Sequence, residues 1–191
     1  FLQLRPRASG EHLQEVRIGP ADEAAAFCRS GLVLGNGVIE TIADVVFVKP
    51  EAFQAGATAQ MAEEIGSLNR GLSAARRPYL LVGPGRWGSS DPWLGIPVKW
   101  RHISGVGAIV ELRNAQLKVE PSQGSHFFQN ITSIGIPYIT VDENGDDRFD
   151  WKVLDDWGLV QETAFIRHVR RERPLRLVID GKRGRGLIIA S

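Results

Sequence analysis

Helical spacing of apolar residues is clearest in the stretch from Phe53 to Ala75. Met61, Ile65, Leu68 and Leu72 recur at intervals of three and four residues, which place them on one face of a helix. Small and charged residues fill the positions between them. The pattern predicts an amphipathic helix whose apolar stripe packs against the core of the protein.

Short apolar runs bounded by Gly, Pro, Asn or Asp predict strands in the rest of the chain. The run "PYLLVG" is continuously apolar, as in a strand that is buried on both faces. "FLQLRP" instead alternates apolar and polar positions until Pro6 ends it. The other predicted strands are "GLVLG", "ADVVFVKP", "GAIVEL", "QLKVEP", "PYITVD", "VQETAFIRHVRRE" and "PLRLVID".

Further helices are expected between these strands. "PADEAAAFCRS" begins with Pro20 and acidic residues, as helices often do. The segment after His126 and the stretch "FDWKVLDDWG" are also predicted to be helical, while Asn36-Gly37, "DENGDD" and "DGKRGRG" indicate turns. Strands and helices therefore alternate, which is typical of an α/β fold.

Composition adds limits on function. The 191 residues include 23 basic and 22 acidic side chains, so no net field favours nucleic acid or a membrane surface as a partner. No apolar stretch reaches the roughly 18 residues of a membrane span. Cys28 is the single cysteine, which excludes an internal disulfide and fits a reducing, cytoplasmic location. We expect Cys28 to be a small buried residue of the helix that begins at Pro20.

The loop "GPGRWG", from Gly83 to Gly88, follows a predicted strand and satisfies the dinucleotide pattern G-x-G-x-x-G. A dinucleotide site also needs a helix that begins at this loop, and Pro92 would lie within the second turn of that helix. We therefore expect an ordinary or substrate-facing loop in which Arg86 could bind an anion.

Two other charged stretches have a simple interpretation. "DENGDD" places Asp147 and Val153 where a calcium loop requires Gly and Glu, so a surface turn is expected rather than a metal site. "RHVRRER" is expected to be a solvated strand face. Apart from this basic run, no sequence feature suggests a functional role for His168, and none does for His12 or His102.

His126 stands out by its setting. Ser125 before it is a plausible N-cap, and the positive end of the following helix would lie beside the imidazole ring. Such a position favours the neutral ring and an attached anion, and a neutral imidazole is a competent nucleophile. By chemistry alone, a structural role is the more common one for a lone histidine of this kind.

Four segments of the chain resemble the phosphoenolpyruvate synthase and pyruvate phosphate dikinase family, which includes rifampicin phosphotransferase-like proteins. "GSHFFQNITSIGIPYITV" is similar to the phosphohistidine loop of the family's swivelling domain, with the same nine-residue step from His126 to Gly135. "YLLVGPGRWGSSDPWLGIPVKW" with "GAIVE" resembles the strands and loop before it. "LVIDGKRGRGLII" resembles the closing strand pair, and "FLQLRP" resembles the last strand of the family's ATP-grasp domain.

This resemblance implies a swivelling β/β/α phosphohistidine domain with a mixed sheet and flanking helices. Residues 1–6 would be the tail of an upstream ATP-grasp domain, 7–30 a linker and helix, and 31–191 the swivelling domain, with "RPRASGEHLQ" as the hinge. The chain would then be a fragment of a longer protein, inactive by itself.

The resemblance also implies roles for residues. His126, supported by Ser125 and Gly124, would accept a phosphoryl group from ATP and pass it to a small-molecule acceptor such as pyruvate. Gln3 and Arg5 would belong to an ATP site that lies mainly upstream and requires Mg²⁺.

The chain also departs from the family pattern. The double glycine and threonine that the family has before the histidine are replaced by Ser122, Gln123, Gly124 and Ser125. Phe127 and Phe128 replace the small residues after the histidine. A regulatory or docking domain that keeps the fold without the transfer therefore stays open, as does a nucleotide-dependent enzyme that uses "GPGRWG".

Overall fold

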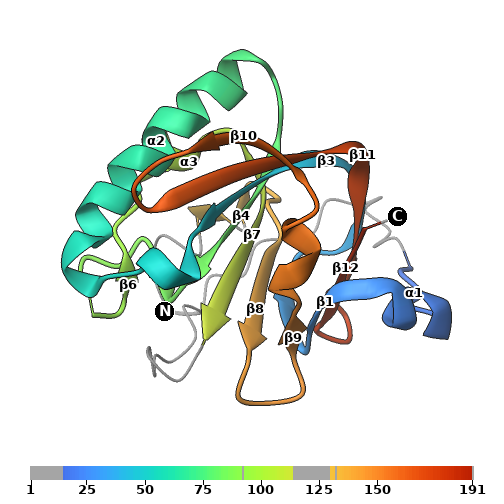
Figure 1. Cartoon of the computed structure of the whole chain (residues 1–191). Coiled ribbons are helices and arrows are strands. Elements are labelled where there is room, and N and C mark those ends of the chain that lie inside the picture. Colours follow the sequence, from blue (N-terminus) through green and yellow to red (C-terminus); the bar gives the residue numbers. More distant parts are fainter. Residues whose placement is uncertain (1–14, 92, 114–129, 132, 191) are drawn as a thin grey trace.

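The computed structural model of the chain describes residues 15–91, 93–113, 130, 131 and 133–190, and these form a mixed sheet with helices (Figure 1). Ten strands of the described residues belong to one sheet. The expectation of an α/β fold with a mixed sheet is thereby confirmed.

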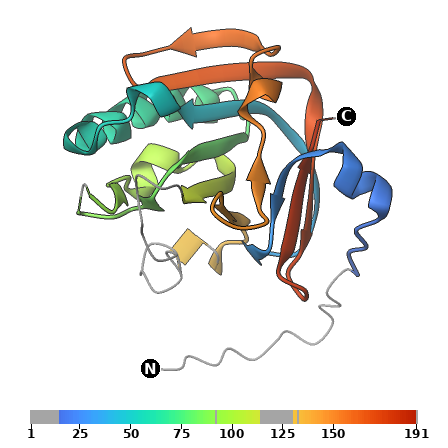
Figure 2. The same ribbon diagram turned by 60° about the horizontal axis from the view of Figure 1, so that its bottom comes forward.

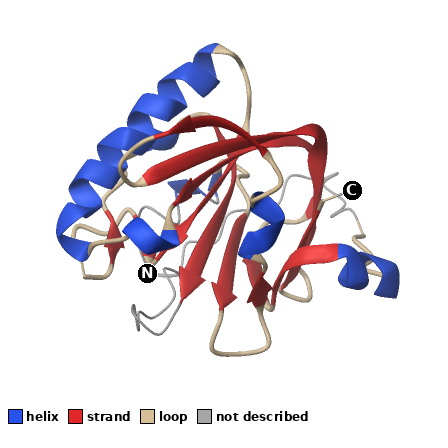
Figure 3. Ribbon diagram, in the orientation of Figure 1, coloured by secondary structure: helices blue, strands red, loops and turns tan. Residues whose placement is uncertain are grey.

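Four parallel strands form the centre of the sheet. They are adjacent in the order β8 (Tyr138–Asp142), β7 (Val106–Arg113), β4 (Tyr79–Pro84) and β3 (Gly37–Val48). Parallel neighbours need long crossover connections, which here include α2 (Thr58–Ala74) between β3 and β4 and α3 (Trp100–Ile103) between β4 and β7. Both helices lie on the same side of the sheet (Figure 3).

Antiparallel strands extend this centre on both sides. β11 (Ile166–Asp180) pairs with β3, and β12, β1 and β9 follow in turn beyond it. β2 pairs with β8 at the other side, and β10 pairs with β11. The bounds of these strands are Arg185–Ile189 for β12, Ala26–Ser30 for β1, Arg148–Phe149 for β9, Leu32–Leu34 for β2 and Gly158–Glu162 for β10.

Six short elements complete the described part of the chain. They are α1 (Pro20–Ala25), η1 (Pro50–Ala52), η2 (Ala55–Ala57), η3 (Trp151–Leu154) and the two strands of a separate small sheet, β5 (Arg86–Trp87) and β6 (Gly95–Ile96).

The sheet rolls so that its two ends approach each other (Figure 2). β1 contacts β8, and the Ser30 hydroxyl of β1 donates a hydrogen bond to the carbonyl of Thr140 in β8. Alternate residues of the parallel strands therefore face two different cores. In β3, Val45 and Phe47 pack inside the roll, whereas Val46 and Val48 pack beneath α2. This burial on both faces is the reason for the continuous apolar runs in the sequence.

A buried asparagine connects α2 to the sheet and to α3. The Oδ1 atom of Asn69 accepts hydrogen bonds from the Tyr79 hydroxyl at 3.1 Å and from the amide of Gly105 at 2.9 Å. Its Nδ2 atom donates to the Ser104 hydroxyl at 3.1 Å and to the carbonyl of Arg101 at 3.3 Å. One side chain thus satisfies polar groups from three neighbouring segments.

Most sequence predictions for helices and strands are confirmed where the structure describes them. Met61, Ile65, Leu68 and Leu72 are buried on α2, and every residue of β4 is buried. The strand predicted from "QLKVEP" and the N-terminal segments "FLQLRP" and "RPRASGEHLQ" lie outside the described residues.

Other predictions need correction. Cys28 is buried as expected, but it lies in β1 because the helix that begins at Pro20 ends at Ala25. Pairing with β12 and β9 therefore prevails over the helical tendency of an alanine-rich run, and residues 26–30 belong to the sheet rather than to a linker. Asn36-Gly37 lies at the break between β2 and β3, and these two strands pair with other strands, β2 with β8 and β3 with β4 and β11.

Among the residues that the structure describes, none forms a helix with both the length and the apolar composition of a membrane crossing.

Replacement of Asn69 by alanine is predicted to lower the free energy of unfolding by about 2–3 kcal/mol, because it leaves the Gly105 amide and the Tyr79 hydroxyl buried without an acceptor. Urea unfolding followed by circular dichroism measures the loss. The exposed Asn144→Ala variant serves as the control and should change stability by less than about 0.5 kcal/mol. Equal effects of the two changes would contradict the connecting role of Asn69.

Candidate functional site

Only one of the residues that the sequence singled out for function lies in the described part of the chain. His126, Ser125, Gly124, Gln3 and Arg5 lie outside the described residues. Arg86 is described, and it follows the carboxyl end of β4 as the first residue of β5. Arg86 therefore lies at the carboxyl edge of the parallel strands.

The loop after β4 does not have the geometry of a dinucleotide site. The amide of Gly85 donates to Leu112 at 2.9 Å, that of Arg86 to Leu94 at 2.8 Å, and that of Gly88 to Ile96 at 2.8 Å. These N–H groups bond carbonyls of the protein instead of pointing at a ligand. No helix begins at Ser89, and the next one along the described chain is α3. The hypothesis of a nucleotide enzyme that uses "GPGRWG" loses its structural basis.

Tight packing fixes the shape of this loop. The Trp87 indole is buried, and its Nε1 atom donates to the carbonyl of Val110 in β7 at 3.1 Å. A Cβ atom on Gly83 would lie 2.7 Å from the Trp87 ring, and one on Gly95 would lie 1.9 Å from the backbone oxygen of Arg86. Both glycines are thus needed where another part of the chain comes close. The loop holds the backbone of Arg86 in one place.

A buried carboxylate lies beside the loop in β7. Glu111 is opposite Gly83 of β4, and it accepts a hydrogen bond from the hydroxyl of Tyr138 at the beginning of β8. Both side chains are about 1% exposed. Residues 114–129, which include His126, follow β7 directly in the sequence. Glu111 and Tyr138 are thus the buried polar groups that the described structure adds to the carboxyl edge.

The acidic segment after β8 forms a turn, as expected, and its carboxylates bond nearby and distant groups of the protein. Asp142 accepts from the amide of Asn144 at 3.1 Å and forms an ion pair with Arg113 at 3.2 Å. Asp147 accepts from the amides of Gly31 at 2.7 Å and Asp142 at 3.0 Å. Across the described ranges, no group of three or more His, Cys, Asp or Glu side chains is arranged to hold a metal ion.

The expectation that "RHVRRER" is a solvated face is wrong for part of that stretch. His168 is 3% exposed, and its Nε2 atom lies 2.7 Å from Oδ1 of Asp44, which is itself 1% exposed. Arg170 donates to Oδ1 of Asp44 and Arg77 to Oδ2, both at 2.8 Å. A single carboxylate of β3 therefore joins β11 and the residues after α2.

Electrostatics explain why Asp44 is stable in this position. Burial raises the pKa of the Asp44 carboxyl, but hydrogen bonds from His168, Arg170 and Arg77 outweigh burial and lower that pKa to about 2. Asp44 stands opposite Tyr79, the first residue of β4, so the cluster lies at the amino end of the parallel strands. It is remote from the carboxyl edge, and its contacts indicate a structural role.

Sequence reasoning missed these buried charges although one signal was present. Asp44 interrupts the apolar run "IADVVFV", and Glu111 interrupts "GAIVEL". A charged residue within a strand that is buried on both faces requires a partner. The sequence does not reveal that the partner of Asp44 is 124 positions away.

His102, which carried no signal in the sequence, is also buried. Its Nδ1 atom accepts from the amide of Lys99 at 3.2 Å, and burial lowers its pKa. These contacts place it in the packing between α2 and α3.

Comparisons of the chain with protein-family models, with curated proteins and with solved structures gave no match. Functional inference for this protein therefore depends on its residues and their geometry.

The Asp44 cluster predicts a specific pH dependence. Because the folded pKa of about 2 is below the unfolded value of about 3.9, the cluster stabilises the protein above about pH 4. This contribution, roughly 2 kcal/mol, should be lost as the pH falls from about 4 to about 2. The difference in unfolding free energy between the wild type and Asp44→Asn should therefore shrink over that range, as measured by urea unfolding at several pH values. Asp146→Asn, at an exposed position, is the control, and a difference that stays constant with pH would contradict the assignment.

The loop geometry predicts that Gly95→Ala destabilises the protein by about 2 kcal/mol or more, because the new methyl group collides with the backbone of Arg86. Gly71→Ala in α2 meets open space and should instead stabilise by about 0.5–1 kcal/mol. Thermal unfolding of both variants compares the two effects. A neutral Gly95→Ala variant would show that the β5–β6 pair adjusts easily.

Proposed function

We propose that this chain is the phosphoryl carrier domain of a phosphotransferase similar to phosphoenolpyruvate synthase and pyruvate phosphate dikinase. In this proposal His126 accepts a phosphoryl group from ATP and passes it to a small-molecule acceptor such as pyruvate. ATP and Mg²⁺ would be bound mainly by an upstream ATP-grasp domain, to which Gln3 and Arg5 contribute.

The arrangement of the resembling segments in one sheet is the observation that carries the proposal. "YLLVG" lies in β4, "GAIVE" in β7 and "YITV" in β8, and these three strands are adjacent and parallel. "LVID" and "GLII" lie in β11 and β12, which pair with each other. Segments that are separated along the chain thus share one structural unit, as a common origin with the family's domain would require.

The described residues around the histidine segment also fit the proposal. Asn130, Ile131 and Ser133 are helical, which agrees with a helix after His126. Gly135 has a φ of 83°, a conformation that favours glycine, so its place in the Gly-Ile-Pro triplet before β8 has a physical reason. Ligands of open α/β sheets commonly bind at the carboxyl ends of the strands, where the His126 segment leaves β7 and where Arg86 lies.

The proposed reaction has two steps. A neutral imidazole nitrogen of His126 forms a bond to a phosphorus atom of ATP while a phosphoanhydride bond breaks, and the nucleotide leaves with the bonding electrons. An oxygen of the acceptor then bonds to the phosphorus, the N–P bond breaks, and the imidazole nitrogen regains its electron pair. The helix after Ser125 would stabilise the attached anion through its positive end.

Labelled ATP tests the proposal directly. The protein, together with its proposed upstream ATP-grasp domain, is incubated with Mg²⁺ and with ATP labelled in separate samples at the β and γ phosphorus. We predict label on the protein, from the γ phosphorus alone if that atom is attacked and from both if the β phosphorus is attacked. The label should be stable to base, labile to acid and lost in His126→Ala. His12→Ala is the matched control and should retain the label.

The alternative function is a regulatory or docking domain that keeps the fold but transfers no phosphate. The rings of Phe127 and Phe128 next to the histidine are the observation that favours it. Absence of label from the wild-type protein, with ATP binding intact, would support this alternative and refute transfer.

A further inference from the structure

β10 is an edge strand whose side chains are unusually exposed to solvent. Among the described residues it pairs with β11 alone, and all five of its residues are exposed. Leu159 and Val160 are 60% and 46% exposed. Figure 2 shows β10 at the rim of the sheet, with no other described element beyond it. Edge strands usually carry charged residues, proline or bulges that prevent pairing, and β10 has a bulge at Val160 and one charged residue, Glu162, at its end.

A pocket of about 690 Å³ opens where β10 begins. One wall comes from a large bulge in β11, where Arg170 stands opposite Asp44 but Leu175 stands opposite Ile42. Residues 171–174 therefore face only Ala43, which removes them from the regular ladder. The other wall is the chain that enters β10, including Trp157 and Gly158.

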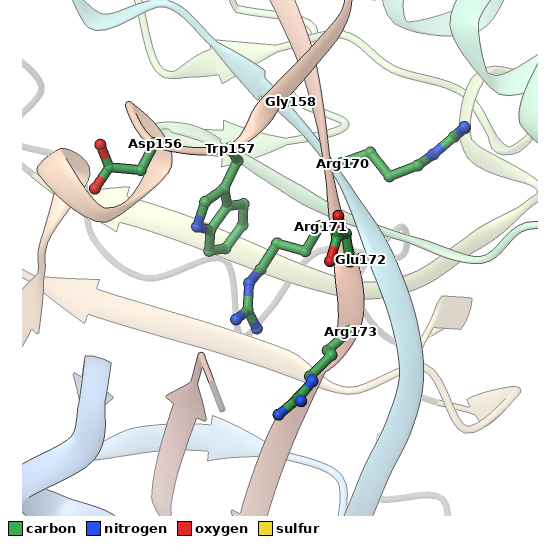
Figure 4. A pocket seen from close by; sticks show the side chains of 7 residues that line it. All are labelled: Asp156, Trp157, Gly158, Arg170, Arg171, Glu172 and Arg173. Atoms are coloured by element: carbon green, nitrogen blue, oxygen red, sulfur yellow. The ribbon is translucent and has the colours of Figure 1, made fainter.

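The bulge presents two guanidinium groups to the pocket. Arg171 and Arg173 extend from β11 on the side of Trp157, whereas Arg170 extends away to the other side (Figure 4). The Arg171 Cζ atom lies 5.4 Å from the centroid of the Trp157 ring. This cation–π contact orients the guanidinium. Arg173 forms no ion pair within the described part of the chain.

The pocket and the strand edge form one continuous surface. Gly158 belongs to both, since it is the first residue of β10 and it lines the pocket. Leu159 pairs with Val169 and Gly158 with Arg170, so Trp157 and Leu159 point to the same face as Arg171. An extended segment that runs along β10 would place one end at the guanidinium groups and an apolar side chain against Leu159.

We propose that this surface, formed by β10, Trp157, Arg171 and Arg173, binds an extended segment of a partner protein by strand addition. The partner segment carries an acidic side chain at the end that lies beside Gly158, followed by alternating apolar residues. Backbone hydrogen bonds to β10 supply affinity, and the arginine pocket supplies specificity. This inference does not depend on the proposed phosphoryl transfer.

The charges of the pocket favour such a segment over a small polyanion. Arg170 is already engaged by Asp44, and the carboxylates of Asp156 and Glu172 also line the pocket. These two acids oppose a phosphate dianion, whereas one side-chain carboxylate can bond a guanidinium in bidentate fashion. The exposed apolar residues of β10 would remain uncovered by a small anion but are covered by an added strand.

Selection from a library of displayed seven-residue linear peptides, with the 191-residue chain immobilised, tests the proposal. We expect enrichment of peptides with an acidic residue at one end and alternating β-branched or aromatic residues. Amide hydrogen exchange with a synthesised selected peptide should slow at residues 158–162. No enrichment over the bare support, or protection confined to other strands, would overturn the proposal.

Variants test which residues of this surface bind the peptide. Arg171→Gln combined with Arg173→Gln should weaken peptide binding at least tenfold, and Leu159→Lys should weaken it severalfold. Arg70→Gln, an exposed charge change on α2, should leave binding unchanged, and thermal unfolding checks that all variants fold.

Unchanged affinity in the double arginine variant refutes the pocket's role. Displacement of the peptide by millimolar inorganic phosphate alone would assign the pocket to a small anion. Dimerisation of the chain that is lost in Leu159→Lys would assign the edge to a second copy, and either outcome overturns the proposal.

Discussion

Burial of the parallel strands on both faces is the constraint on which the rest of the structure depends. α2 and α3 cover one face, and the rolled antiparallel strands cover the other. A polar group within these strands therefore needs a partner from the protein itself. Asp44 bonds the imidazole of His168 and two arginine side chains, Glu111 accepts from Tyr138, and the Trp87 indole donates to the carbonyl of Val110. Most of the buried polar contacts at both ends of the strands follow from this requirement.

The roll of the sheet also explains where charged residues collect. β11 pairs with β3 along its length, but its first part also pairs with β10 and its last part with β12. The strand bends between these parts, and the bulge at residues 171–174 absorbs the bend. Arg171 and Arg173 leave the ladder there and reach a pocket beside the open edge of β10. The same distortion that closes the core thus creates the surface that we assign to a partner segment.

The candidate site illustrates how far sequence reasoning reaches. The quoted segments were sufficient to predict the strands that form β4, β7 and β8, because the apolar pattern of a strand is local. Pro92 was sufficient to argue against a dinucleotide helix after "GPGRWG", and the engaged amides of that loop agree. The buried groups at the carboxyl edge were not predictable. Glu111 and Tyr138 are separated by 27 positions, and only strand order brings them together.

By itself, the sequence determined the α/β class, the apolar stripe of α2 and the buried strand β4, because local periodicity reports which side of an element is apolar. It did not determine which strands would pair. Cys28 lies in an alanine-rich run with helical tendency, but it belongs to the sheet because its strand pairs with β12 and β9. His168 lies in a basic run, but it is buried in contact with Asp44. Such outcomes depend on the free energy of contacts with distant residues, which only the tertiary structure brings together.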